Sequence, residues 1–345
     1  MFADITSIHA ANLRLFDGQP NTNTTTELTA EMKTYYDMHL IDMAQPLLVH
    51  DQFGQKRPIP QGRGKTIEFR KYTPLTKATT PLTEGVTPDG KKLNVTTITA
   101  TVKQYGDYIT ISDVLKMTAI DDNLVQAQKL LANQAGLTLD TITRDILNAG
   151  TNVQYGEGNV DSRANLVGGD ADAGNNNYLT VRALKMAART LKKQNAPLIN
   201  GTYVGIIHPD VAFDLTDDPE WKYPHQYVDT ENIYSGEIGK IANIRFVETT
   251  EAMRWDNAAK DTTSGSGDRD VYSTLVMGAD AYGVTEVSGG GLEFIVKQLG
   301  SSGTADPLNQ RATAGWKAIK TAEILVDQYM VRIETTSTFN DHDAA

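Results

Sequence analysis

The segment of residues 205–252 constrains the fold most, because it predicts a strand, a helix and a second strand that together form one α/β unit. The apolar run 204–207 predicts a short buried strand. His208-Pro209-Asp210 then predicts a helix start, since proline suits the first helical turn. Residues 234–240 predict a short helical or looped piece broken by glycines, and residues 244–248 predict a second strand. Strand and helix therefore alternate here.

The composition is that of a folded globular protein. Of 345 residues, 40% are hydrophobic and 22% are charged, which argues against wholesale disorder. A chain of this length predicts about two domains. The absence of cysteine excludes disulfides and thiolate metal sites, and it fits a reducing cytosol.

Charge and hydropathy limit the partners. No apolar run reaches the roughly 18 residues of a membrane span, and residues 1–14 lack the basic start and apolar core of an export signal. We therefore expect no membrane partner. A net charge of -11 argues against wrapping nucleic acid, although it is compatible with a surface that faces DNA without gripping it.

Two helices and a polar excursion stand out in the first half of the chain. Apolar and aromatic residues at helical spacing predict helices over 28–49 and 121–148. Alternating residues predict strands over 66–72 and 94–103, on either side of the excursion 73–93, which has few large apolar residues. The excursion is either a surface loop or, as we favour, a segment docked on a neighbouring subunit.

The second half mixes loops with regular elements. Glycine and proline predict a loop over 54–64, and glycine, asparagine and aspartate predict another over 150–177. Polar residues predict a third loop over 257–270. We expect a helix capped by Thr180. Three strands are predicted, over 271–277, 292–299 and 316–335, the last of them long and unbroken.

Chemical motifs are weak. Gly64-Lys65-Thr66 resembles the end of a phosphate-binding loop, but Ile59 stands where its first glycine belongs. Asp170 and Asp172 begin like a calcium loop that then falls out of register. The six histidines lack zinc spacing. One enzymatic alternative is a cytosolic hydrolase that uses His208 with Asp210 or Asp214.

Several segments together resemble a known family. They are PLTEGVTPDGKKL, KQYGDYITISDVL, IIHPDVAFDL, GEIGKIANIRFVET and DPLNQRATAGWKAIKTAEILVDQYMVRIET. In wording and order they are similar to the major capsid proteins of tailed bacteriophages, which share the HK97-like fold. The resemblance covers most of residues 29–338.

The resemblance implies an α+β fold with a fixed order of parts. These are an N-terminal arm (1–50), the extended two-stranded E-loop with its flanking strands (51–112), a peripheral domain with a long spine helix (113–160), an axial α/β domain (161–290), and a return to the peripheral domain with a C-terminal tail (291–345).

The implied function is structural. Copies would assemble as hexamers and pentamers into an icosahedral phage head around double-stranded DNA, in the host cytoplasm, with scaffolding, portal and decoration proteins as further candidate partners. No catalytic residue, cofactor or metal site is expected. The candidate subunit-interface residues are Lys77, Glu84, Lys91, Lys92, Trp221 and Tyr223. A cellular nanocompartment shell of the same fold, enclosing protein cargo, is the second alternative.

Overall fold

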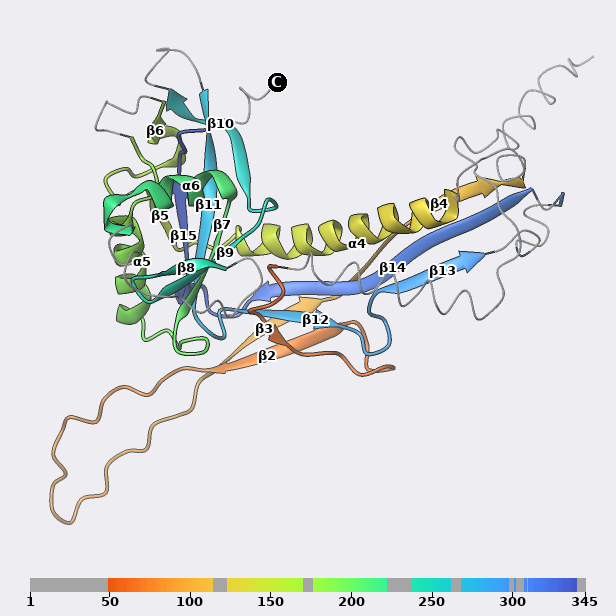
Figure 1. Ribbon diagram of the computed structural model, residues 1–345. Coiled ribbons are helices and arrows are strands. Elements are labelled where there is room, and N and C mark those ends of the chain that lie inside the picture. Colours follow the sequence, from red (N-terminus) through yellow and green to blue (C-terminus); the bar gives the residue numbers. More distant parts are fainter. Residues whose placement is uncertain are drawn as a thin grey trace, which may run out of the picture. The chain divides into compact units, whose positions relative to one another are not determined.

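The structure is a computed structural model that describes residues 49–113, 123–169, 176–221, 237–261, 268–297, 301, 307–308 and 310–339 (Figure 1). These residues belong to two units. The smaller is built from described residues of Tyr105–Gly136 and Leu292–Ala318, and the larger from those of Pro46–Gln104, Leu137–Gly291 and Ile319–Ala345. The predicted helix over 28–49 lies outside the described residues, apart from Val49.

A mixed sheet organises the larger unit. Its strands follow the order β5 (Val153–Tyr155), β15 (Met330–Thr335), β11 (Asp268–Met277), β7 (Tyr203–Ile207), β9 (Ile244–Glu248) and β8 (Glu237–Ile241). β7 and β9 pair in parallel, and α6 (Pro209–Asp217) lies in the crossover connection that such a pair needs, which confirms the predicted α/β unit. β10 (Arg254–Asp261) pairs with β11 and with β6 (Val167–Gly168).

Two helices cover one face of this sheet. α5 (Val181–Lys193) and α6 (Pro209–Asp217) lie beside the strands in Figure 1. They share an apolar core with alternate strand residues such as Tyr203, Tyr272 and Val276. The intervening residues, such as Val204 and Leu275, face a second core that also contains Leu147 from the end of α4. Alternation along each strand therefore separates two layers.

The predicted helix starts are confirmed. The Thr180 hydroxyl accepts the Ala183 N–H at 3.2 Å, which caps α5. Pro209 occupies the first turn of α6. α4 (Asn123–Leu147) confirms the long helix, and it ends shortly before Gly150. The first two residues of the predicted range, Asp121 and Asp122, lie outside the described residues.

Three predicted loops contain strands. Residues 237–241 form β8, whose register shift between Glu237 and Gly239 marks a bulge. Much of 257–270 belongs to β10 and β11, where a register shift and a positive φ at Asn257 break the alternation that would have revealed a strand. Residues 150–177 include β5 and β6, short strands formed by pairing with distant segments.

The predicted long strand over 316–335 is two strands. β14 (Arg311–Ile324) ends before a 3₁₀ turn, Asp327–Tyr329, and β15 follows it. In the larger unit, the end of β14 pairs with β12 (Tyr282–Glu286), whereas β15 pairs with β11 and β5. The chain therefore changes partners at the turn.

The predicted hairpin around the polar excursion is confirmed. β2 (Thr66–Tyr72) and β3 (Val95–Thr101) pair antiparallel along their whole length, and residues 73–94 leave them as a long open loop (Figure 1). Residues 54–64 are not wholly irregular, because β1 (Gln55–Lys56) pairs with β12. The 292–299 prediction is confirmed as β13 (Glu293–Lys297).

The smaller unit joins strands to the first part of α4. β13 pairs with β14 from Thr313 to Lys317, and β4 (Lys103–Ser112) also pairs with β14. The Trp316 indole donates to the Gln134 side chain at 3.2 Å, and Gln134 donates to Asp107 at 2.7 Å. This chain of hydrogen bonds ties helix and strands together.

Candidate functional site

The loop of residues 73–94 presents apolar side chains to solvent. All of its residues are exposed. Its large apolar side chains are 56% to 76% exposed, namely Leu75, Leu82, Val86 and Leu93. A segment that buries none of its large apolar side chains adds nothing to its own core, so these side chains form a surface suited to a partner.

Four candidate interface residues lie on this loop, with different surroundings. The Lys91 ammonium donates to the carbonyl and the hydroxyl of Thr76, at 2.8 and 2.6 Å, and so braces the loop internally. Within the described residues, Lys77, Glu84 and Lys92 have no ion-pair partner. Their charged groups are therefore available for contact outside the subunit.

The base of the hairpin is anchored. Phe69 of β2 packs over Gly283 of β12, where an added Cβ would lie only 3.0 Å from the ring. The Thr73 N–H donates to the Asn94 carbonyl at 3.0 Å and closes the hairpin end. A fixed base thus carries an open loop.

The larger unit contains a buried polar cluster. Its members come from the start of the described chain, from α4, from β12 and from β14: His50, Asp51, Asp140, Thr143, Tyr282 and Lys320. Asp140 accepts the His50 backbone N–H at 2.8 Å and lies 2.6 Å from His50 Nδ1. The Tyr282 hydroxyl donates to the His50 carbonyl. The cluster fixes residue 50 against the spine helix.

A buried ion pair completes the cluster. Asp51 pairs with Lys320, and it also accepts a hydrogen bond from the Thr143 hydroxyl at 2.7 Å. Lys320 donates in addition to the Leu139 carbonyl at 3.0 Å. The charges of Asp51 and Lys320 are thus paired with each other and hydrogen-bonded inside the protein, which is the condition under which buried charges are tolerated.

His208 has a structural position. It is the N-cap of α6, where its Nδ1 accepts the Asp210 N–H at 3.3 Å. The Asp210 carboxylate in turn accepts the Tyr272 hydroxyl at 2.7 Å. Burial lowers the pKa of His208, which favours the neutral ring that the cap requires.

The described residues around His208 do not form the site that the hydrolase alternative requires. Within the described residues, His208 has no hydroxyl or thiol as a hydrogen-bond partner. Asp214 bonds instead to the Thr338 N–H at 3.0 Å and to its hydroxyl, and burial raises the pKa of Asp214. A nucleophile, a base and an orienting carboxylate do not converge.

Of the two remaining interface candidates, Trp221 and Tyr223, the structure describes only Trp221. Trp221 is only 5% exposed and packs edge-on against Phe246. The side chain lies inside the subunit, and its role at a contact stays a prediction. Tyr223 lies outside the described residues.

Among the residues that the structure describes, no group of three or more His, Asp or Glu side chains is placed to hold a metal ion. The helices described here include none long and apolar enough to cross a membrane.

Comparison with known proteins gives the family of this chain. A family model described as phage capsid protein matches residues 94–326. The chain belongs to this phage capsid protein family, has the HK97-like α+β fold, and serves as a structural coat protein of the virion. No curated protein sequence matches it.

Solved structures agree on the fold at low sequence identity. The capsid of Ralstonia phage GP4 is 15% identical with a TM-score of 0.65, over 93% of this chain and 96% of that one. The cyanophage Pam1 capsid is 12% identical with a TM-score of 0.62, over 97% and 99%. A virus-like particle from Pyrococcus furiosus is 9% identical with a TM-score of 0.50, over 88% and 100%.

Proposed function

We propose that the chain is the major capsid protein of a phage, and that copies assemble as hexamers and pentamers into a closed icosahedral head around double-stranded DNA. The family supports a coat protein that builds a capsid lattice. The observation that supports the loop as an assembly element is its four exposed apolar side chains, which its own subunit leaves uncovered.

The loop of residues 73–94 would lie on a neighbouring subunit. Burying an apolar side chain contributes roughly 1.5–3 kcal/mol, so four of them would stabilise each contact substantially. The charged residues Lys77, Glu84 and Lys92 would then set the register between copies, because complementary charges favour one alignment.

Assembly in the host cytoplasm, with scaffolding, portal and decoration proteins as partners, completes the proposal. The subunit itself would not be an enzyme. The capping position of His208 supports this, since that role needs neither a substrate nor a nucleophile.

Negative-stain electron microscopy of the purified protein, and of native particles containing it, tests the proposal. We expect closed particles that contain this chain and nuclease-protected DNA. Monomers under all assembly conditions, together with absence of the chain from the particles, would contradict a shell role. Particles filled with an enzyme cargo in place of DNA would identify a nanocompartment.

A further inference from the structure

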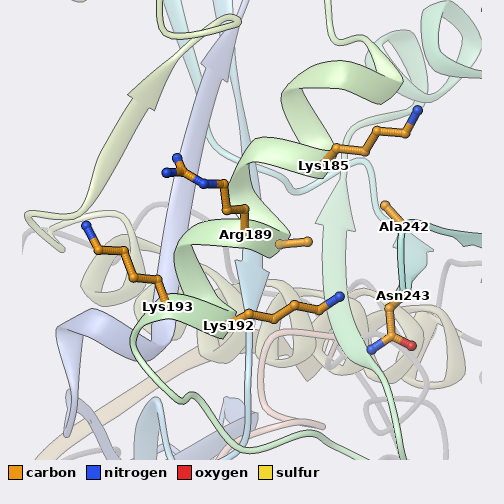
Figure 2. Close-up of a pocket in the computed structure, with 7 residues that line it drawn as sticks. Lys185, Arg189, Lys192, Lys193, Ala242 and Asn243 are labelled. Carbon is orange, nitrogen blue, oxygen red and sulfur yellow. The ribbon is translucent and has the colours of Figure 1, made fainter.

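A groove with a basic wall lies between α5, from Lys185 to Lys193, and the turn that joins β8 to β9. Its volume is about 700 Å³. We call it the basic groove, and Figure 2 labels these lining residues: Lys185, Arg189, Lys192, Lys193, Ala242 and Asn243. The four cations stand on one helix of a chain whose net charge is -11.

Most of this positive charge is not neutralised within the subunit. Lys185 pairs with Glu220. In the part of the chain that the structure describes, the side chains of Arg189, Lys192 and Lys193 are exposed and have neither an ion-pair nor a hydrogen-bond partner. Like charges at such short helical spacing repel one another, so the arrangement suits an anion from outside the subunit.

The helix dipole explains only part of the cluster. Cations in the last turn of a helix are stabilised by its C-terminal carbonyls, and Lys192 and Lys193 stand there. Arg189 precedes that turn, and Figure 2 shows Lys192 pointing toward the side of Asn243 while Arg189 and Lys193 point the other way. Among the free cations, Lys192 therefore faces the opposite wall of the groove, and Arg189 and Lys193 extend the positive charge over the adjoining surface of the helix.

The opposite wall adds a polar group on a fixed backbone. Ala242 and Asn243 both have positive φ, 51° and 67°, and form the tight turn of the hairpin. The Asn243 carbonyl accepts the Tyr203 N–H at 2.9 Å, which holds the turn on the sheet. Arginine, lysine and asparagine side chains are those that commonly contact nucleic-acid phosphates.

The lining favours a phosphate backbone over an acidic protein. Its apolar side chains are only Ala188 and Ala242 among the described residues, whereas protein interfaces rely on aromatic anchors and are depleted in lysine. It also offers no aromatic face for a base. Because salt screens charges beyond about 8–10 Å, the acidic residues elsewhere weigh little against this local cluster.

We propose that the basic groove binds the phosphate backbone of double-stranded DNA without reading its sequence. The inference rests on the proposed function, since it places this surface against packaged DNA. It refines the sequence-based expectation of a surface that faces DNA without gripping it. Lys192 at the groove, with Arg189 and Lys193 on the adjoining helix surface, gives a weak contact, which many copies in one shell would repeat.

Fluorescence anisotropy of the full-length chain with a short duplex of mixed sequence tests the groove. The variant R189Q/K192Q/K193Q removes its three free cations. The control K56Q/R57Q/R63Q removes three exposed cations from the segment around β1, with the same change in net charge. Each neutralised phosphate contributes about -0.9 to the slope of log affinity against log salt, so we expect a wild-type slope of about -3.

We expect the groove variant to lose at least about tenfold in affinity at low salt and most of that slope, while the control binds like the wild type. Failure of the wild type to bind the duplex, unchanged binding by the groove variant, or equal loss in both variants would overturn the proposal. So would a poly-glutamate peptide that displaces the duplex at equal charge concentration, since it would indicate an acidic protein partner.

Particle formation separates this inference from the proposed function. Suppose that the wild type forms particles and that the groove substitutions leave duplex binding unchanged. This result would contradict DNA binding by the basic groove but not the shell role. Suppose instead that the wild type never forms particles but that its duplex binding depends on the groove residues. This result would contradict the shell role and support DNA binding by the basic groove.

Discussion

One histidine shows how a residue suited to catalysis serves the fold. His208 follows a buried strand and precedes Pro209, and its ring nitrogen closes the first turn of α6 by accepting the Asp210 N–H. That bond exists only while the nitrogen is unprotonated. Burial, which lowers the pKa of His208, keeps it so near neutral pH.

We therefore expect His208 to make stability depend on pH. Its folded pKa lies below its unfolded value of about 6.5, so the unfolded chain takes up the proton first and stability falls as pH drops below about 6.5. His208→Asn keeps a good capping side chain and removes the titration. Urea denaturation between about pH 8 and pH 5 should show a shallower decline in the variant. Parallel declines would contradict this role.

The buried ion pair of Asp51 and Lys320 gives a prediction with a control on the same strand. Lys320→Met leaves the Asp51 carboxylate buried without its cation, and removing one partner of such a pair costs about 3–5 kcal/mol. Lys317→Met removes a half-exposed pair with Glu293, which is worth at most about 1 kcal/mol. Chemical denaturation compares the two, and equal losses would show that burial does not decide the effect.

The buried polar cluster was beyond sequence reasoning. The apolar residues that make α4 amphipathic include Leu139. Asp140 and Thr143 lie beside this apolar stripe, on a neighbouring stripe of small residues. From the sequence alone, polar residues on such a stripe are expected to face solvent. Only the fold brings Lys320 against them, across 181 positions from Leu139.

At the scale of elements, regular periodicity and local caps were predictable. α4, α5, α6 and the β2–β3 hairpin follow from repeats and capping residues within a few positions. β8 and β10 were missed because each contains a bulge that interrupts the alternation. The turn between β14 and β15 contains neither glycine nor proline, and only the change of pairing partners produces it.

The loop of residues 73–94 is the element whose removal should separate folding from assembly. Replacing residues 74–93 with Asn-Gly preserves the contact between Thr73 and Asn94 and provides a two-residue hairpin turn. We expect a soluble subunit with near-normal thermal stability that fails to form closed particles. Sedimentation and electron microscopy measure both properties.

A finer variant tests the apolar side chains alone. Replacing Leu75, Leu82, Val86 and Leu93 with serine keeps the loop length, and it should impair assembly in the same way. The control T79S/T80S/T87S alters polar positions of the same loop. Normal shells from the deletion, or equal effects of the serine variant and the control, would refute the role of the loop.

The whole molecule is best understood as one unit of a larger assembly. Its mixed sheet has an apolar layer on each face, and Phe69 at the base of the hairpin packs on Gly283 of β12. The loop has no such support. Exposed apolar side chains on a loop that extends from a packed sheet suit a protein that buries them against copies of itself.

The most direct measurement is a cryo-electron microscopy map of an intact particle in which neighbouring subunits are resolved. The account predicts that residues 73–94 of one subunit lie on an adjacent subunit, with Leu75, Leu82, Val86 and Leu93 buried at the contact. A map in which this loop extends into solvent and touches no neighbour would contradict the central claim.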